Sequence, residues 1–417
     1  MSIECGRRID YLQNQCNELG ITVTPAGRKL MKDDLVKALR RHFINERYGS
    51  EENIPWSLKF MLSIECPQLC RRIKDLKPEQ QDLVWDSPDW IAEEKIDGCR
   101  MLILYDASEK KFHFYSRNNS VTDYLPQDYS DTILVTVKDN FYYPENFVLD
   151  CEVISTNPET ETNTQCLTQL QSTAALLNLN ANDSKAIQKN NPLKFVVFDC
   201  LYDSKNLIDE TWNIRHKHAD KLSFILKENG FTCELNKVVT NTDDNKNRKR
   251  EFFEEVIDRN GEGVVLKNRN AKYHACSSRT IDCVKVKRST SDSLTKDLDA
   301  FITDYVIGND DTRNENMVVG FVFSVKMEKN NGEIVTHPIA VCSNVSDFIK
   351  EDATVVNENG EVSLNPSYYG KVATLQGQNI SARSLRLTHS TIEMWRPEKS
   401  ADGCEIVKEA ELRKLIF

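Results

Sequence analysis

The chain has 417 residues, 40% of them hydrophobic and 28% charged, with a formal net charge of −10. This composition indicates a globular protein of two or three domains with a sizeable core. The sequence has no apolar run of the roughly 18 residues that a membrane helix needs, and its N-terminal residues lack a secretory pattern. The acidic charge argues against nonspecific coating of nucleic acid, although a local basic surface remains compatible with it. The 13 cysteines are scattered without zinc spacing, so we expect reduced thiols in an intracellular protein.

The N-terminal segment predicts two short helices, over residues 10–19 and 32–43, separated by a turn rich in glycine and proline. Its pattern resembles the SAP module, a small helical nucleic-acid binder. The resemblance implies contacts to DNA phosphates from Arg28, Lys29, Lys32, Lys37, Arg40 and Arg41. The alternative is a solvated helical hairpin that only packs on its neighbour.

The middle of the chain alternates strand-like runs with loops and helices. We expect strands over 101–105, 112–115, 147–154, 195–200, 263–267 and 283–287, and helices over 168–180 and 209–229. Several of these runs are continuously apolar, which is typical of buried strands. Residues 157–165 and 241–250 are expected to be polar loops.

A stretch of Ser, Thr and Asp at 289–299 marks a boundary. Beyond it we expect five strands, over 301–308, 317–327, 333–342, 370–376 and 385–395, with a short helix over 345–351. Five strands with a helix after the third are the layout of an OB barrel, a common nucleic-acid-binding module.

The sharpest local signal is Glu93-Glu94-Lys95-Ile96-Asp97-Gly98-Cys99-Arg100. A lysine nucleophile must be neutral, and burial near cations lowers its pKa from about 10.4. Gly98 allows a tight turn or the close approach of a ligand, and Arg100 is suited to meet a phosphate or ribose. Lys-x-Asp-Gly alone is weak, because an exposed lysine before a turn is common.

The segments that follow strengthen this interpretation by their order. Together with 95–98, the segments 116–118, 149–152, 197–199, 262–267, 284–287 and 396–399 resemble the motifs of the covalent nucleotidyltransferases. That superfamily comprises ATP-dependent DNA ligases, RNA ligases and mRNA capping enzymes. The chain departs from the pattern before the paired lysines, where ligases often carry an aromatic residue and this chain has 281–284.

The resemblance implies a role for each matching residue. Lys95 would be the nucleophile that becomes nucleotidylated, with Asp97 beside it as a catalytic residue of lower rank. Nucleotide contacts would come from Glu93, Arg100, Arg117, Glu152, Phe198, Glu262, Lys267, Lys285 and Lys287. Glu152 and Glu262 would hold Mg²⁺, and Arg396 and Lys399 would orient the pyrophosphate.

The residue types fit these roles on physical grounds as well. Phe198 offers a flat apolar face for a base, although core packing would explain it equally. Lys285 and Lys287 alternate, so they share one face of a strand, and an anion between them would relieve their repulsion. Without the matching motifs, Glu152 and Glu262 would each be interpreted as a surface carboxylate. Arg215 could form a structural ion pair and is left out of the predicted site.

These observations predict an α+β protein. Residues 1–60 would form a small helical SAP-like domain, 61–290 an adenylation domain of antiparallel sheets with helices, and 291–417 an OB-fold β-barrel. The resemblance implies a monomeric ATP-dependent DNA ligase, compact like viral or phage ligases, that uses ATP and Mg²⁺ to seal 5′-phosphate/3′-OH nicks in duplex DNA through lysyl-AMP. The alternatives are an RNA ligase, a capping-type guanylyltransferase and a catalytically silent nucleic-acid-binding scaffold.

Overall fold

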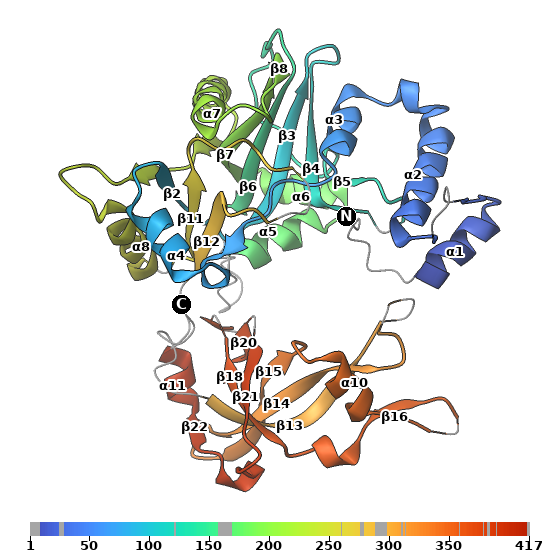
Figure 1. The fold of residues 1–417 in the computed structure, drawn as a ribbon, viewed down its shortest axis with the longest axis vertical. Coiled ribbons are helices and arrows are strands. Elements are labelled where there is room, and N and C mark those ends of the chain that lie inside the picture. Colours follow the sequence, from blue (N-terminus) through green and yellow to red (C-terminus); the bar gives the residue numbers. More distant parts are fainter. Residues whose placement is uncertain are drawn as a thin grey trace. The chain divides into compact units, whose positions relative to one another are not determined.

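The structure is a computed structural model, shown in Figure 1. It describes residues 9–24, 29–120, 122–156, 169–259, 261–275, 279–287, 298–309, 312, 314–357, 359–377, 379–381, 384–388 and 390–414. The chain divides into two compact units, the first ending at Lys287 and the second formed mainly by the residues that follow. In the described part, no helix has the length and apolar character needed to cross a membrane.

The first unit begins with α1 (Ile9–Glu18), α2 (Lys32–Tyr48), the 3-10 turn η1 (Glu51–Asn53) and α3 (Trp56–Ile64). Helix α2 buries an apolar stripe that includes Leu35 and Leu39, as its spacing predicts. The Tyr124 hydroxyl donates to Gln15 Oε1 on α1 over 2.6 Å, and Arg40 Nε on α2 donates to the Tyr124 carbonyl over 2.8 Å. Both helices therefore dock on the loop that contains Tyr124.

The larger sheet of this unit has the order β5-β4-β3-β6-β7-β8, and β9 pairs with β7. Its strands are β3 (Cys99–Asp106), β4 (Lys111–Asn119), β5 (Pro126–Asp128), β6 (Phe147–Ser155), β7 (Leu193–Asp203), β8 (Lys205–Asn206) and β9 (Cys233–Leu235). Alternate side chains of β3 lie in two hydrophobic cores on opposite faces of the sheet. Met101 and Ile103 lie in the core that includes residues of α5 (Gln169–Leu177) and α7 (Trp212–Glu228), whereas Leu102 lies in the core that includes residues of α3. Helices on both faces thus bury the strands that carry the predicted motifs.

The smaller sheet has the order β1-β12-β11-β2-β10. Its strands are β1 (Arg71–Arg72), β2 (Trp90–Glu94), β10 (Val238–Thr240), β11 (Gly263–Asn268) and β12 (Cys283–Lys287). It packs on α4 (Pro78–Asp86) and α8 (Arg248–Asp258) through Val84, Phe252 and Val256. The turn η2 (Ile73–Asp75) follows β1.

The second unit is built on the strand order β15-β14-β13-β18-β21, with β22 beside β14. Its elements are β13 (Leu298–Ile307), β14 (Val318–Glu328), β15 (Ile334–Cys342), α10 (Asp347–Ala353), β16 (Thr354–Val356), β17 (Val362–Leu364), η3 (Pro366–Tyr368), β18 (Val372–Gln376), β19 (Asn379–Ile380), β20 (Leu387–Thr388), β21 (Thr391–Trp395), η4 (Ala401–Gly403), β22 (Ile406–Lys408) and α11 (Glu409–Lys414). Three strands, a helix and two further main strands reproduce the predicted OB layout around one apolar core.

The predicted α+β class and antiparallel sheets are confirmed, with three parallel pairs added: β1–β12, β7–β9 and β14–β22. The helix predicted over 168–180 is wrong at its C-terminal end, because Asn180 is the N-cap of a separate helix, α6 (Ala181–Gln188), and accepts from the Asp183 backbone N–H over 3.0 Å. The strand predicted over 385–395 is two strands, β20 and β21. From Leu12 onward, the N-terminal helices group with the first unit.

Candidate active site

Lys95 lies directly after β2 and beside the start of β11, where its backbone N–H donates to the Gly263 carbonyl over 2.9 Å. Lys95 Nζ is 2.5 Å from Glu262 Oε2, and Glu262 Oε1 is 2.6 Å from Lys287 Nζ. Burial opposes ionisation of Glu262, but the neighbouring Lys95 and Lys287 hold its pKa below the ordinary value. One carboxylate therefore bridges the predicted nucleophile and a predicted phosphate-binding lysine.

The loop after Lys95 runs close against β6. A Cβ atom at Gly98 would lie 2.4 Å from the Val153 carbonyl oxygen and 2.7 Å from the Ile154 side chain. Only glycine fits there, because the loop lies against β6 of the same unit, whereas the sequence indicated the close approach of a ligand. Asp97 lies in this loop, and its catalytic role stays a prediction.

Lys285 and Lys287 share one face of β12, since the intervening Val286 and the preceding Val284 are buried. Burial lowers the pKa of Lys285, and the positive charge of Lys287 lowers it further. In the described part of the chain, Lys285 has no carboxylate partner within ion-pair distance. A cation without a carboxylate partner, beside other cations, is a suitable place for a phosphate.

Glu152 lies on β6, where it is paired in register with Arg100 of β3. Burial raises the pKa of Glu152 to about 7, and the negative charges of Asp150 and Glu262 add to this against the opposing effect of Lys95. A divalent cation would relieve this penalty. No cluster of three or more metal-binding side chains occurs among the described residues. Mg²⁺ is commonly held by one or two carboxylates together with substrate phosphates, and the predicted role of Glu152 and Glu262 as its ligands stays a prediction.

Phe198, on β7, is half-buried and lies beside two cations. Lys267 Nζ is 4.7 Å from the ring centroid and Arg100 Cζ is 5.3 Å from it. Lys267 also pairs with Glu93 Oε2 over 2.8 Å. Burial raises the pKa of Glu93 to about 7, although Lys267 opposes the shift. Glu93 Oε1 is buried and has no hydrogen-bond partner among the described residues, so it is an acceptor available to a ligand N–H beside an aromatic ring.

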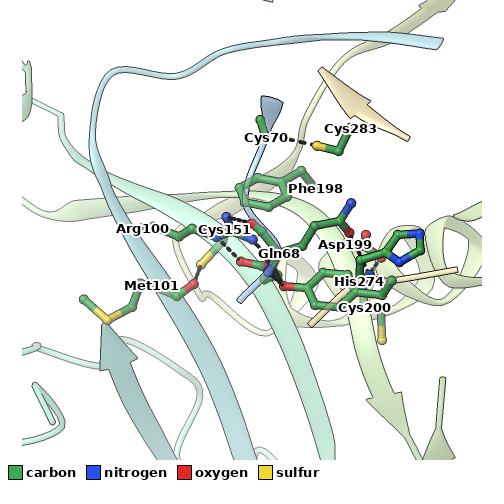
Figure 2. A network of polar contacts seen from close by, with 12 residues as sticks. Gln68, Cys70, Arg100, Met101, Cys151, Phe198, Asp199, Cys200, His274 and Cys283 are labelled. Atoms are coloured by element: carbon green, nitrogen blue, oxygen red, sulfur yellow. Dashed lines mark hydrogen bonds and ion pairs between the residues drawn. The ribbon is translucent and has the colours of Figure 1, made fainter. Parts of the chain in front are cut away.

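Arg100 is directed at Asp150, with Nε and Nη2 donating over 2.9 and 2.6 Å. Its Nη1 donates to the Gln68 carbonyl over 2.5 Å, and the Tyr273 hydroxyl donates to Asp150 over 2.7 Å. Figure 2 shows Arg100 and Gln68 together in this network. Arg100 thus ties the segment before β1 to β6, and its predicted contact with phosphate stays a prediction.

The remaining predicted positions of the first unit differ in their surroundings. Arg117 is exposed near the end of β4, and its predicted nucleotide contact stays a prediction. Arg215, which was left out of the predicted site, forms a structural ion pair, since its Nε donates to Asp199 Oδ1 over 2.8 Å and both side chains are 3% exposed. The Arg215 guanidinium lies over the Tyr273 ring, 5.6 Å from its centroid.

In the second unit, Arg396 and Lys399 converge on Asp299 of β13. Thr374 Oγ1 donates to the same carboxylate over 2.6 Å. Burial opposes ionisation of Asp299, but the hydrogen bonds from Lys399 and Thr374 and the nearby positive charges hold its pKa below the ordinary value. Arg396 also pairs with Glu398. The predicted pyrophosphate-orienting pair is therefore organised by an aspartate.

The N-terminal basic residues are not equivalent. Arg41 pairs with Glu51 over 2.9 Å, and Arg40 is committed to the Tyr124 carbonyl. Lys29 and Lys37 are exposed and Lys32 is half-buried, whereas Arg28 lies outside the described residues. The hairpin packs on its neighbour, as the alternative interpretation expected, and its DNA contacts stay a prediction.

The sequence interpretation missed several residues that organise the site. Gln68, Tyr273 and Asp299 lie outside the recognised motifs, and no local pattern marks them. Their positions follow from contacts between segments far apart in the chain, such as the 2.9 Å hydrogen bond from the Gln68 backbone N–H to the Tyr273 hydroxyl.

The chain is similar in sequence to several DNA ligases and in fold to a solved structure. "DNA ligase 4" of Candida glabrata is 25% identical over 285 residues, which cover 67% of this chain and 28% of that protein. "Probable DNA ligase" of Dictyoglomus turgidum is 28% identical over 216 residues, covering 52% of this chain and 34% of that protein. A solved chain described as "Pmar-Lig_PreS3" has a TM-score of 0.51 at 15% identity, covering 95% of this chain and 87% of that chain, and shows a shared fold.

The chain spans between about a fifth and a third of the length of the curated relatives it matches first. The model of the ATP-dependent DNA ligase domain matches residues 67–287. This range holds Lys95, Glu262 and both lysines of β12, and it is more than half of the sequence. The chain therefore belongs to the ATP-dependent DNA ligase family.

Proposed function

We propose that the chain is an ATP-dependent DNA ligase that seals nicks in duplex DNA through a lysyl-AMP at Lys95. The observation that carries the proposal is the bridge made by Glu262, which holds Lys95 Nζ at 2.5 Å and Lys287 Nζ at 2.6 Å. This bridge supports the proposal because it keeps the Lys95 nitrogen close to Lys287, a cation that can neutralise the phosphates of an incoming triphosphate. Family membership supplies the choice of ATP and DNA.

Three steps follow from this assignment. Lys95 Nζ attacks the α-phosphorus of ATP, an N–P bond forms, and pyrophosphate leaves. AMP then passes to the 5′-phosphate at a nick and releases Lys95. Finally the 3′-OH attacks that activated phosphate, a phosphodiester forms, and AMP departs. In each step the side chains position phosphates and neutralise their charge.

The surroundings of each residue indicate which part of the nucleotide it contacts. Lys285 and Lys287 neutralise the phosphates from one face of β12. Glu93 Oε1 accepts a hydrogen bond from the base, which packs against Phe198. Glu152 and Glu262 would hold Mg²⁺, which supplies further neutralisation of the phosphates. Release of Lys95 from Glu262 is then part of nucleotide loading.

Two cations of the second unit, Arg396 and Lys399, are assigned to the pyrophosphate released in the first step. We infer that Arg396 and Lys399 act on the pyrophosphate, which requires them to exchange the Asp299 carboxylate for a phosphate anion. A fixed carboxylate keeps both side chains ordered until that exchange, so less side-chain entropy is lost when the anion binds.

The test of the chemistry is nucleotide labelling. The full chain is incubated with Mg²⁺ and ATP or GTP labelled at the α-phosphate. We expect label from ATP that survives base and is released by acid, as a phosphoramidate is. Lys95→Arg keeps a cation for Glu262 but removes the nucleophile, so it should carry no label, whereas Lys205→Ala, in an exposed pair with Glu210, should label normally. Label on Lys95→Arg would refute the assignment.

The acceptor is tested separately with the labelled protein. We expect AMP transfer and sealing on nicked duplex DNA, and weaker sealing where RNA supplies the 3′-OH. Preference for the RNA nick would identify an RNA ligase, and label from GTP alone would identify a capping-type enzyme. No label from either nucleotide would leave only a binding role.

We also infer that the N-terminal helices contact DNA phosphates through Lys29 and Lys37. Both side chains are exposed, while α1 and α2 are fixed on the first unit through Gln15 and Arg40. Replacing both lysines with alanine should weaken nick binding and reduce its salt dependence by about one to two ions, with labelling by ATP unchanged. An unaltered salt dependence would contradict this role.

A further inference from the structure

Two cysteines meet at the edge of the smaller sheet. Cys70 directly precedes β1, Cys283 begins β12, and the parallel pairing of these strands sets Arg71 opposite Val284. The two cysteines therefore occupy the preceding pair of positions, and their sulfurs are 3.1 Å apart; Figure 2 shows them pointing toward each other. Neighbouring strands lie about 4.8 Å apart, which is within the range of Cα separations that a disulfide spans.

The two thiols have unequal chemistry. The hydrogen bond from Cys283 lowers the pKa of Cys70, with help from the positive charges of Arg100, Lys267 and Lys95 and against the effect of burial. The same hydrogen bond, together with burial, raises the pKa of Cys283. A half-buried thiol whose pKa is lowered, in contact with a second thiol, is the arrangement of a reactive dithiol.

We propose that Cys70 and Cys283 are a modification site, a dithiol that peroxide oxidises to a disulfide and that thereby suppresses nucleotide loading at Lys95. The Cys70 thiolate attacks one peroxide oxygen, the O–O bond breaks, and a sulfenic acid and hydroxide result. The Cys283 sulfur then attacks the sulfenic sulfur, the S–S bond forms, and water leaves after proton transfer. Peroxide takes both electrons, and a small thiol reverses the reaction by exchange.

The disulfide would act on the nucleotide site through position and through charge. Cys283 is opposite Lys267 on β11 and two residues from Lys285. The segment that ends at Cys70 carries Gln68, whose carbonyl accepts from Arg100 over 2.5 Å. Oxidation joins this segment covalently to β12 and removes the negative thiolate from among the cations. The effect on loading rests on the proposed function, whereas formation of the disulfide does not.

The first experiment maps the bond. The full chain is treated with hydrogen peroxide, remaining thiols are alkylated under denaturing conditions, and unreduced peptides are analysed by mass spectrometry. We expect a peptide that links Cys70 to Cys283, absent from Cys283→Ala and retained in Cys99→Ala. Cys99 is the matched control, since it is also half-buried but burial raises its pKa to about 11. Cys70 left unmodified, or oxidised without a partner, would overturn the proposal.

The second experiment measures label from ATP on reduced, oxidised and re-reduced protein. Oxidation should reduce labelling several-fold, dithiothreitol should restore it, and Cys283→Ala should keep its label through peroxide treatment. A disulfide that forms without any loss of label would refute the regulatory half of the proposal. Reduced protein without label would instead refute the proposed function, while the peptide map would still decide whether the dithiol forms a disulfide.

Discussion

Replacing Lys267 with methionine tests how strongly the Lys267 ammonium group stabilises the ionised form of the buried Glu93. Lys267 Nζ lies 2.8 Å from Glu93 Oε2, and the two side chains are 12% and 2% exposed. Methionine keeps a long apolar side chain beside Phe198 but removes the ammonium group. Burial has already raised the pKa of Glu93 to about 7 while Lys267 lowers it, so in the variant this pKa should rise above 7.

The size of the effect depends on pH. Between pH 4.5 and about 7, Glu93 is protonated in both folded proteins and ionised in the unfolded chain, so both lose stability together as pH rises. Above about 7 the contribution of Glu93 in the native protein becomes constant, because Glu93 is then ionised in both states. The variant continues to lose about 1.4 kcal/mol per pH unit until its own Glu93 ionises. The gap in unfolding free energy should therefore widen above pH 7.

The assay is urea unfolding, followed by tryptophan fluorescence, from about pH 6 to about pH 9. Lys205→Met, which removes a 62% exposed partner of Glu210, should differ from the native protein by a small and nearly constant unfolding free energy across this range, because exposed pairs contribute little. The double variant Glu93→Gln/Lys267→Met should lose the widening gap. A gap for Lys267→Met that stays constant from pH 6 to 9 would refute the account of Glu93.

Two further substitutions test the contacts that the sequence did not reveal. Tyr273→Phe leaves the Gln68 backbone N–H without its 2.9 Å acceptor and should destabilise the first unit by about 2 kcal/mol, whereas Tyr142→Phe, on an exposed side chain, should have an effect below about 0.5 kcal/mol in the same urea titration. Asp299→Asn weakens the hold on Lys399 and should speed hydrogen exchange in β13 and β18; protection equal to that of the native protein would show that this carboxylate does not stabilise the unit.

The fold was predictable where one segment determines its own structure. Met101–Tyr105 and the other apolar runs became strands because a continuously apolar stretch is buried on both faces, here by α3 on one side and by α5 and α7 on the other. The helix predicted over 168–180 extends beyond the end of α5 at Leu177, and α6 was not predicted. Asn180 is the N-cap of α6 and accepts from the Asp183 backbone N–H, and hydrophobic periodicity does not reveal a single cap.

The site was predictable where residue type and order suffice. Lys95, Glu262 and Lys287 were predicted from separate motifs, and the antiparallel pairing of β11 with both β2 and β12 brings them together. The pairing of Arg100 with Asp150 and the contact between Cys70 and Cys283 were not predicted. Both depend on strand register, because a shift of one residue would turn these side chains to the other face of the sheet.

The ion pairs between carboxylates and the lysines of the candidate site share a physical cause. Glu262 holds Lys95 and Lys287, Glu93 holds Lys267, and Asp299 holds Lys399. A partly buried cation is costly without a counter-charge, so each carboxylate stabilises a cation that the proposed reaction assigns to the nucleotide or its phosphates.

A phosphate therefore competes with the Glu262 carboxylate at Lys287. At Lys285 a phosphate meets a cation that has no ion-pair partner in the described part of the chain. Burial already lowers the pKa of Lys285. Lys285 should accordingly gain the most from phosphate binding. Lys285→Ala should raise the ATP concentration needed for half-maximal labelling more than Lys287→Ala does, because a phosphate must displace the Glu262 carboxylate from Lys287 and, among the described residues, has no carboxylate to displace from Lys285. The reverse order in a titration of label against ATP would show that the carboxylate bridge, and not the lone cation, dominates phosphate capture.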